Sequence, residues 1–149
     1  MRCATPPAAR LRPPESLMPS SPPAPSSICN AAIVLGEVEA QAAFCIAQGN
    51  DVCLLQGTTG EWPSLSLNER IELATEWRRC VPYGHPMKLI LHIGHDALPD
   101  AKTLAKLASE LKYDAVLLSP PSKFVAANVT AQVACLAEVL QHCSDLPSF

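Results

Sequence analysis

The chain has 149 residues, of which 48% are hydrophobic and 17% charged, and its formal net charge is −3. This composition favours burial of apolar surface over disorder throughout, and the length suits one ordinary domain but falls short of the roughly 250 residues of a complete eight-stranded β/α barrel. The acidic balance argues against a nucleic-acid or anionic-membrane partner, and no window of about 18 apolar residues predicts a membrane span.

The first 27 residues combine eight prolines with serine and alanine. Because proline lacks an amide donor and disrupts helix and sheet, we expect residues 1–27 to form a disordered leader and residues 28–149 to form the folded part. Arg2, Arg10 and Arg12 precede the first acidic residue, as in an organelle transit peptide, whereas the prolines disfavour the amphipathic helix of such a peptide. The sequence therefore leaves open whether this leader is a transit peptide.

Short apolar runs then alternate with longer amphipathic stretches. Residues 31–48, rich in alanine and aliphatic side chains and followed by a glycine, predict a helix. Short, uninterrupted apolar runs are typical of parallel strands buried on both faces. Three such runs are found, at residues 51–56, 87–93 and 115–118.

The helix between the first two runs has a readable start. Ser66 followed by Glu69 forms a capping box, which predicts that the helix begins at Ser66. An apolar stripe at helical spacing predicts the face that packs on the sheet, with the charged residues mostly off it. The stripe is Leu67, Ile71, Ala74 and Trp77, and the charged residues are Glu69, Arg70, Glu76 and Arg78.

Two further helices follow from the same spacing. Their apolar positions are Ala101, Leu104, Ala105, Ala108 and Leu111 in one, and Ala131, Ala134, Ala137 and Leu140 in the other. The order is therefore one helix and then three strand–helix units, and right-handed crossovers make all three strands parallel. Periodicity alone leaves both a barrel and a doubly wound sheet open.

The segment after the first strand is a candidate binding loop. It reads Gly57-Thr58-Thr59-Gly60-Glu61. Ligands of α/β folds bind where strands end, glycines permit a tight turn, and two threonines offer donors suited to a small carboxylate. Taken alone, the pattern fits an anion site and an ordinary turn equally well.

Further signals stand at fixed distances from this loop. They are Ser64-Leu65-Ser66, Glu69-Arg70 and the strand end His92-Ile93-Gly94. Together with the loop they resemble the N-acetylneuraminate lyase and dihydrodipicolinate synthase family over residues 31–149, most closely from 57 to 70. The last four residues, 146–149, resemble the approach to the fifth strand of the lyase branch, which makes the resemblance closer to that branch.

This resemblance implies a (β/α)8 barrel, of which the chain would hold about strands two to four. In the family a lysine forms a Schiff base with pyruvate or a sugar acid, and this Schiff base accepts electrons during carbon–carbon cleavage. The lyase branch splits N-acetylneuraminate (a sialic acid) into pyruvate and N-acetylmannosamine. By resemblance, Thr58 and Thr59, with Gly57, bind the pyruvate carboxylate and orient the substrate. Family members use no cofactor or metal and are homo-oligomers.

No lysine or tyrosine of this chain fits the catalytic roles, which the family places on its fifth and sixth strands. Lys88 opens a strand, on the opposite face from the loop, and Tyr83 and Tyr113 also precede strands. Lys102, Lys106 and Lys112 are expected on the solvent side of a helix, and Lys123 follows a strand in a loop without apolar enclosure. We therefore expect an incomplete barrel that is inactive by itself.

Two other features bear on the site. His92 and His95 are three residues apart near a strand end, which puts them on opposite faces and favours one packed and one solvated histidine over a metal site. The family usually has an aromatic pair beyond a proline after the last predicted strand, whereas this chain has Ser119-Pro120-Pro121-Ser122-Lys123-Phe124. Dimer and pocket contacts are therefore in question there.

Seven cysteines without a C-x-x-C pair argue against zinc ribbons and redox motifs. Since no secretory signal is recognisable, reduced thiols and a cytoplasmic location are expected.

Two alternative functions remain open. One keeps the family but changes the aldehyde partner, as in dihydrodipicolinate synthase or another pyruvate aldolase. The other is a small doubly wound domain in which the glycine-flanked loop binds a phosphate at a helix N-terminus. A cooperative monomer would favour the latter, because a piece of a barrel has open edges and an uncovered inner face.

Overall fold

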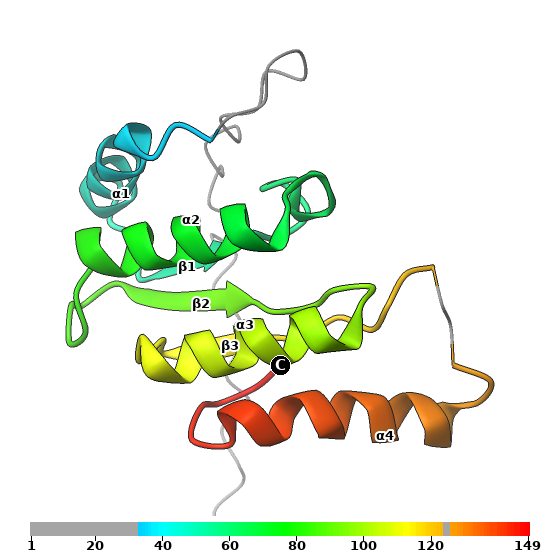
Figure 1. Cartoon of the computed structure of the whole chain (residues 1–149). Helices are drawn as coiled ribbons and strands as arrows, with labels where there is room; N and C mark the ends of the chain where they lie inside the picture. Colours follow the sequence, from blue (N-terminus) through cyan, green and yellow to red (C-terminus); the bar gives the residue numbers. More distant parts are fainter. Residues whose placement is uncertain (1–32, 124–125) are drawn as a thin grey trace, which may run out of the picture.

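The computed structural model describes residues 33–123 and 126–149 (Figure 1). The expected disordered leader, residues 1–27, lies outside the described residues. The strands are β1 (Val52–Leu55), β2 (Lys88–His92) and β3 (Ala115–Leu117). The helices are α1 (Gly36–Ala47), α2 (Leu67–Cys80), α3 (Leu98–Glu110) and α4 (Val129–Leu140), with short 3-10 turns η1 (Trp62–Ser64) and η2 (Gln141–Cys143).

The three strands form one parallel sheet in the order β1-β2-β3. Each strand therefore lies beside the strand that follows it in the chain, with a helix between the two. This confirms the predicted strand–helix units and their parallel direction.

Helices cover one face of this sheet. Leu55, Leu91 and Val116 are in register across the strands and at most 4% exposed, and Figure 1 shows α2 and α3 in front of the sheet. On the other face, Leu54 is 42% exposed and its register partner Ile90 is half-buried. In the described part of the chain the helices lie on one side of the sheet, as in the wall of a barrel. A doubly wound sheet has helices on both sides, so the doubly wound alternative is wrong.

The predicted start of α2 is confirmed. Ser66 is its N-cap: its hydroxyl accepts from the Glu69 amide, and the Glu69 carboxylate accepts from the Ser66 amide at 2.8 Å. The prediction that Arg70 and Arg78 lie off the packed face is wrong. Arg70 is 0% and Arg78 8% exposed. Acceptors inside the protein bind all three nitrogens of the Arg70 guanidinium and both terminal nitrogens of Arg78, whose Nε has no partner among the described residues.

The first and last helices, α1 and α4, also differ from prediction. Helix α1 begins at Gly36, later than the predicted residue 31. The predicted helix near the end is present as α4, but two of its predicted apolar positions, Ala134 and Ala137, are exposed while Val139 is fully buried. Apolar residues lie on most sides of this helix, so the alanine spacing does not mark its buried face.

The last residues of the chain extend the sheet. Val116 donates its amide to the Pro147 carbonyl at 2.9 Å, and the Phe149 amide donates to the Val116 carbonyl at 3.0 Å. The bridge between Val116 and Ser148 is parallel. Residues 147–149 therefore lie where the next strand of a barrel wall would lie.

None of the helices in the described part of the chain is long and apolar enough to cross a membrane.

Candidate functional site

The Gly57–Glu61 loop directly follows β1 and lies at the C-terminal edge of the sheet. Gln56 and Glu61, at φ 55° and 50°, have left-handed backbone conformations at either side of it. The Glu61 amide donates to the Thr58 carbonyl at 3.0 Å and closes a turn. Thr58 and Thr59 are exposed and Gly57 is half-buried, so both threonine side chains are open to a ligand.

Gly60 allows this turn to fold back on the strand end. A Cβ atom at this position would lie 3.2 Å from Gln56 Cα and 3.4 Å from the Gly57 carbonyl oxygen. Both neighbours are backbone atoms, which cannot move aside cheaply. The glycine is therefore required by the close approach of the two backbone segments.

Arg70 lies beneath the loop and links the ends of two strands. Its Nε donates to Gln56 Oε1 at 2.8 Å and its Nη1 to the Gly94 carbonyl at 2.8 Å, while Nη2 donates to the His92 carbonyl. The Gln56 side-chain amide donates back to the Arg70 carbonyl at 2.7 Å. This reciprocal pair fixes the residue immediately before Gly57 to helix α2.

His92 is buried beside this arginine. Its Nε2 lies 2.8 Å from Ser119 Oγ, and the Trp62 ring packs on it with centroids 5.1 Å apart. Burial, and then the positive charge of Arg70, lower the pKa of His92 to about 4, with the Gln56 backbone opposing the shift in part. The imidazole is therefore neutral at physiological pH.

Trp62 closes this end of the sheet. Its ring lies 5.3 Å from the Arg70 guanidinium carbon and 6.2 Å from the His95 ring. His95 is half-buried, and its Nδ1 accepts from the Ala97 amide at 3.0 Å, so it is more exposed than the buried His92 but only partly solvated. Among the described residues, no group of three or more histidine, cysteine, aspartate or glutamate side chains is arranged to hold a metal.

The lysines of the chain lie away from the loop or at the surface. Lys88 begins β2 and pairs with Asp114 at 3.3 Å, at the end of the sheet opposite the loop. Lys102 and Lys106 are on α3 and pair with Glu138 and Glu110. Lys112 lies in the turn after α3 rather than on it, with φ 55°, and Lys123 is exposed.

Neither tyrosine reaches the loop edge. Tyr83 is 69% exposed and precedes β2. Tyr113 is buried and donates its hydroxyl to the Ala74 carbonyl at 2.7 Å. Burial raises the Tyr113 pKa, which makes this phenol a poor proton-transfer group.

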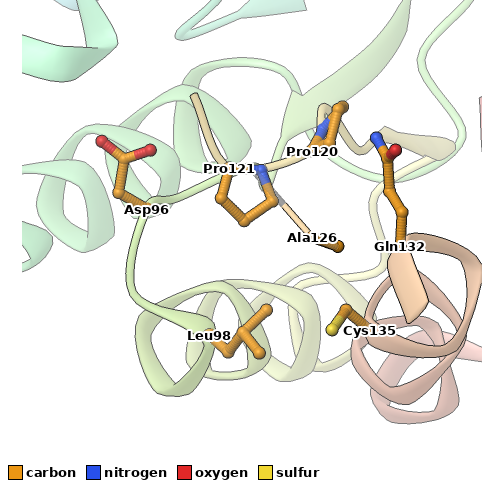
Figure 2. Close-up of a pocket in the computed structure, with 7 residues that line it drawn as sticks. All are labelled: Asp96, Leu98, Pro120, Pro121, Ala126, Gln132 and Cys135. Atoms are coloured by element: carbon orange, nitrogen blue, oxygen red, sulfur yellow. The ribbon is translucent and has the colours of Figure 1, made fainter. Parts of the chain in front are cut away.

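A cavity of about 240 Å³ lies beyond the adjacent strand ends and is separate from the threonine loop (Figure 2). Asp96, Leu98, Pro120, Pro121, Ala126, Gln132 and Cys135 line it. Asp96 accepts from the Ser122 amide at 2.7 Å and so joins the two loops around the cavity. The departure from the family pattern after Leu118 therefore shapes a mainly apolar hollow.

Sequence reasoning missed the supporting residues of the site. The sequence pattern assigns no role to Gln56 or Trp62, includes Ser119 only as part of a loop, and places Arg70 in a motif and on the polar side of its helix. The available signals were a glutamine at the end of an apolar strand and an arginine one turn into the next helix. These two residue types are common at such positions, and they indicate a site only once their mutual hydrogen bonds are known.

A three-stranded parallel sheet with helices on one face and a glycine–threonine turn at its C-terminal edge defines part of a β/α-barrel protein. The model of the dihydrodipicolinate synthetase family matches residues 31–142, and the chain belongs to this family. Members of the family are class I aldolases that bind pyruvate-type substrates.

Several similar curated proteins are N-acetylneuraminate lyases. The chain is 37% identical over 95 residues to N-acetylneuraminate lyase A of Xenopus laevis, covering 64% of this chain and 31% of that protein. It is 32% identical over 102 residues to the Rattus norvegicus enzyme, covering 68% and 32%. The chain thus spans about a third of the length of these curated relatives.

Solved structures agree on the fold. The N-acetylneuraminate lyase of Proteus mirabilis superposes with a TM-score of 0.75 at 24% identity, covering 88% of this chain and 42% of that one. The Mycoplasma synoviae enzyme gives 0.72 at 26% identity, covering 80% and 40%. The chain therefore matches part of a barrel of this type.

Proposed function

We propose that this chain is the pyruvate-binding part of an N-acetylneuraminate lyase-type class I aldolase. The complete reaction would cleave N-acetylneuraminate to pyruvate and N-acetylmannosamine through a lysine Schiff base. The observation that supports this most is the exposed Thr58-Thr59 turn at the C-terminal edge of a barrel strand, in a chain whose named relatives are lyases.

Thr58 and Thr59, with the Gly57 backbone, would bind the carboxylate of pyruvate or of the sialic acid. Hydroxyl and amide donors suit a carboxylate, and Gly57 lets the ligand approach the backbone. These residues would orient the ketone rather than break a bond, so their contribution to rate is positional.

Binding by the loop is tested by titrating the whole chain with pyruvate and following residue-resolved amide shifts by NMR. We expect the shifts to centre on Gly57, Thr58 and Thr59. The double variant Thr58→Val with Thr59→Val should weaken binding on the order of a hundredfold or more, since each lost hydrogen bond to a charged group is worth about 1.5–3 kcal/mol. Thr130→Val, at an exposed threonine on α4, is the matched control. Shifts confined to other surfaces would refute the loop as the binding site.

We further propose that this chain by itself forms no Schiff base. Lys88, Lys102 and Lys106 are engaged in ion pairs and none of them lies at the loop edge. Incubation with pyruvate and borohydride should leave the intact mass unchanged, while a complete lyase treated in parallel gains the trapped adduct. A stable adduct on any lysine of this chain would contradict the proposal.

Two finer points belong to the same proposal. The aldehyde partner would be N-acetylmannosamine, as the names of the relatives suggest. A product assay on a chain joined to the remaining barrel strands would distinguish it from the partner of dihydrodipicolinate synthase.

A cytoplasmic location is supported by the free thiols of Cys45, Cys53, Cys80, Cys135 and Cys143 and is tested by cell fractionation.

A further inference from the structure

Arg70 is a buried cation whose hydrogen-bond acceptors in the described part of the chain are all neutral groups. Its side chain is 0% exposed, and its three acceptors are the Gln56 amide oxygen and the carbonyls of His92 and Gly94. The other buried arginine, Arg78, has a carboxylate partner, Asp114, at 3.2 Å. Of the ion pairs formed by described residues, none includes Arg70.

Neutral acceptors satisfy the hydrogen-bonding capacity of a guanidinium without cancelling its charge. Burying a cation in this way is costly unless hydrogen bonds and favourable charges offset the loss of water. The adjacent imidazole of His92 is neutral and gives no compensation. Asp100 is the acid whose charge acts on Arg70, and it makes no hydrogen bond to it. The guanidinium charge is thus offset by Asp100 without a direct hydrogen bond, and none of its three described acceptors carries a charge.

The charge of Arg70 is located at the base of the candidate loop. Gln56, which bonds to Arg70 through both side-chain atoms, immediately precedes Gly57. Trp62, which follows the loop, lies over the guanidinium at 5.3 Å. The loop therefore begins and ends on residues that contact Arg70, and low-dielectric walls strengthen a charge at such a point.

We infer that Arg70 is a positioning residue that makes the Thr58-Thr59 loop selective for a carboxylate over a neutral ligand. The guanidinium fixes the start of the loop through Gln56, and its charge stabilises the anionic group of an α-keto acid bound above it. The inference rests on the proposed function, because it concerns the same loop.

The test compares two ligands that differ in charge, pyruvate and its neutral amide, pyruvamide. Their dissociation constants are measured by NMR titration for the whole chain and for three variants. We expect the original chain to prefer pyruvate and Arg70→Met to lose that preference on the order of tenfold, mainly through weaker pyruvate binding. Arg70→Lys should restore most of the preference, and Arg78→Met should retain it because its charge lies at the opposite end of the sheet.

A second variant removes the field while keeping the arginine. Gln56→Glu places a carboxylate against Arg70 Nε, so it should cancel the charge and abolish the preference for pyruvate even if Arg70→Met fails to fold. An unchanged ratio of the two dissociation constants in Gln56→Glu or in folded Arg70→Met would overturn the inference. Absence of pyruvate binding by the original chain would instead refute the proposed function.

Discussion

Close packing around Gly94 decides how the strand ends meet below the loop. A Cβ atom at Gly94 would clash with Ser119 Oγ and lie 2.9 Å from His92 Nε2. Both atoms belong to the hydrogen-bonded pair that joins the second and third strand ends. Glycine here therefore permits an ordered contact between two neighbouring loops of the barrel wall.

We expect Gly94→Ala to lower the free energy of unfolding by roughly 1–3 kcal/mol, because the added methyl group overpacks this contact. Gly36→Ala is the control, since a Cβ there meets no atom within 4 Å. Urea denaturation of both variants measures the difference. Equal stabilities would contradict the packing seen at Gly94.

His92 makes the stability depend on pH. Its pKa is about 4 in the folded chain and about 6.5 when unfolded, so the unfolded state binds the proton more readily. The stability contributed by neutral His92 is complete above pH 6.5 and is lost as the pH falls from about 6.5 towards 4.

His92→Gln should therefore flatten the pH dependence of unfolding between pH 6.5 and 4, relative to the original chain. His142→Gln, at an exposed position, should leave the slope as it is. Denaturation midpoints at several pH values measure this. The difference between the two variants isolates His92 from carboxylates, such as Asp96 and Asp114, whose pKa values are also lowered.

At the scale of the element, the start of helix α2 is set by residues near in sequence, whereas its buried face is set by residues distant in sequence. Its start is determined by Ser66 and Glu69, which are neighbours in sequence. Its buried face instead includes Arg70 and Arg78, whose partners, except the Val81 carbonyl, come from segments 14 to 36 residues away. The cap therefore sets where the helix begins, and distant acceptors decide which side is buried.

Ser66→Ala should cost about 1 kcal/mol, because an orphan amide of the first turn loses its acceptor. Loss of the serine hydroxyl also removes the stronger of the two Ser66 hydrogen bonds that hold the Glu69 pKa below its ordinary value, while the backbone amide at position 66 still donates, so that pKa should rise in part. Thermal unfolding and NMR titration of Glu69 report the two effects, with exposed Ser144→Ala as the control. A Glu69 pKa that does not move would contradict the capping box.

At the scale of the whole molecule, the described residues leave one apolar face of the sheet without a covering helix and pair with it at the β3 edge alone. Leu54, Ile90 and Leu117 lie on the face away from the helices, and Leu54 is 42% exposed. The β3 edge is covered by residues 147–149 through backbone hydrogen bonds. In a closed barrel both the face and the edges are buried.

Deleting residues 146–149 should lower the free energy of unfolding by roughly 1–3 kcal/mol, because three backbone hydrogen bonds to β3 are lost. The uncovered edge should also increase self-association, which analytical ultracentrifugation measures as a higher average mass. Phe149→Ser, which keeps the backbone pairing, is the control. A deletion variant with unchanged stability and mass would show that this pairing does not protect the edge.

The sequence by itself determined the local and repeating features: the strand–helix order, the start of α2 at Ser66 and the glycine–threonine loop after β1. These depend on spacing, capping and turn chemistry, which neighbours in the chain specify. Only the tertiary structure decided that helices cover a single face, that Arg70 is buried on Gln56 and two carbonyls, and that α4 packs through Val139. The reason is physical, because the burial of a polar side chain depends on acceptors brought from distant segments.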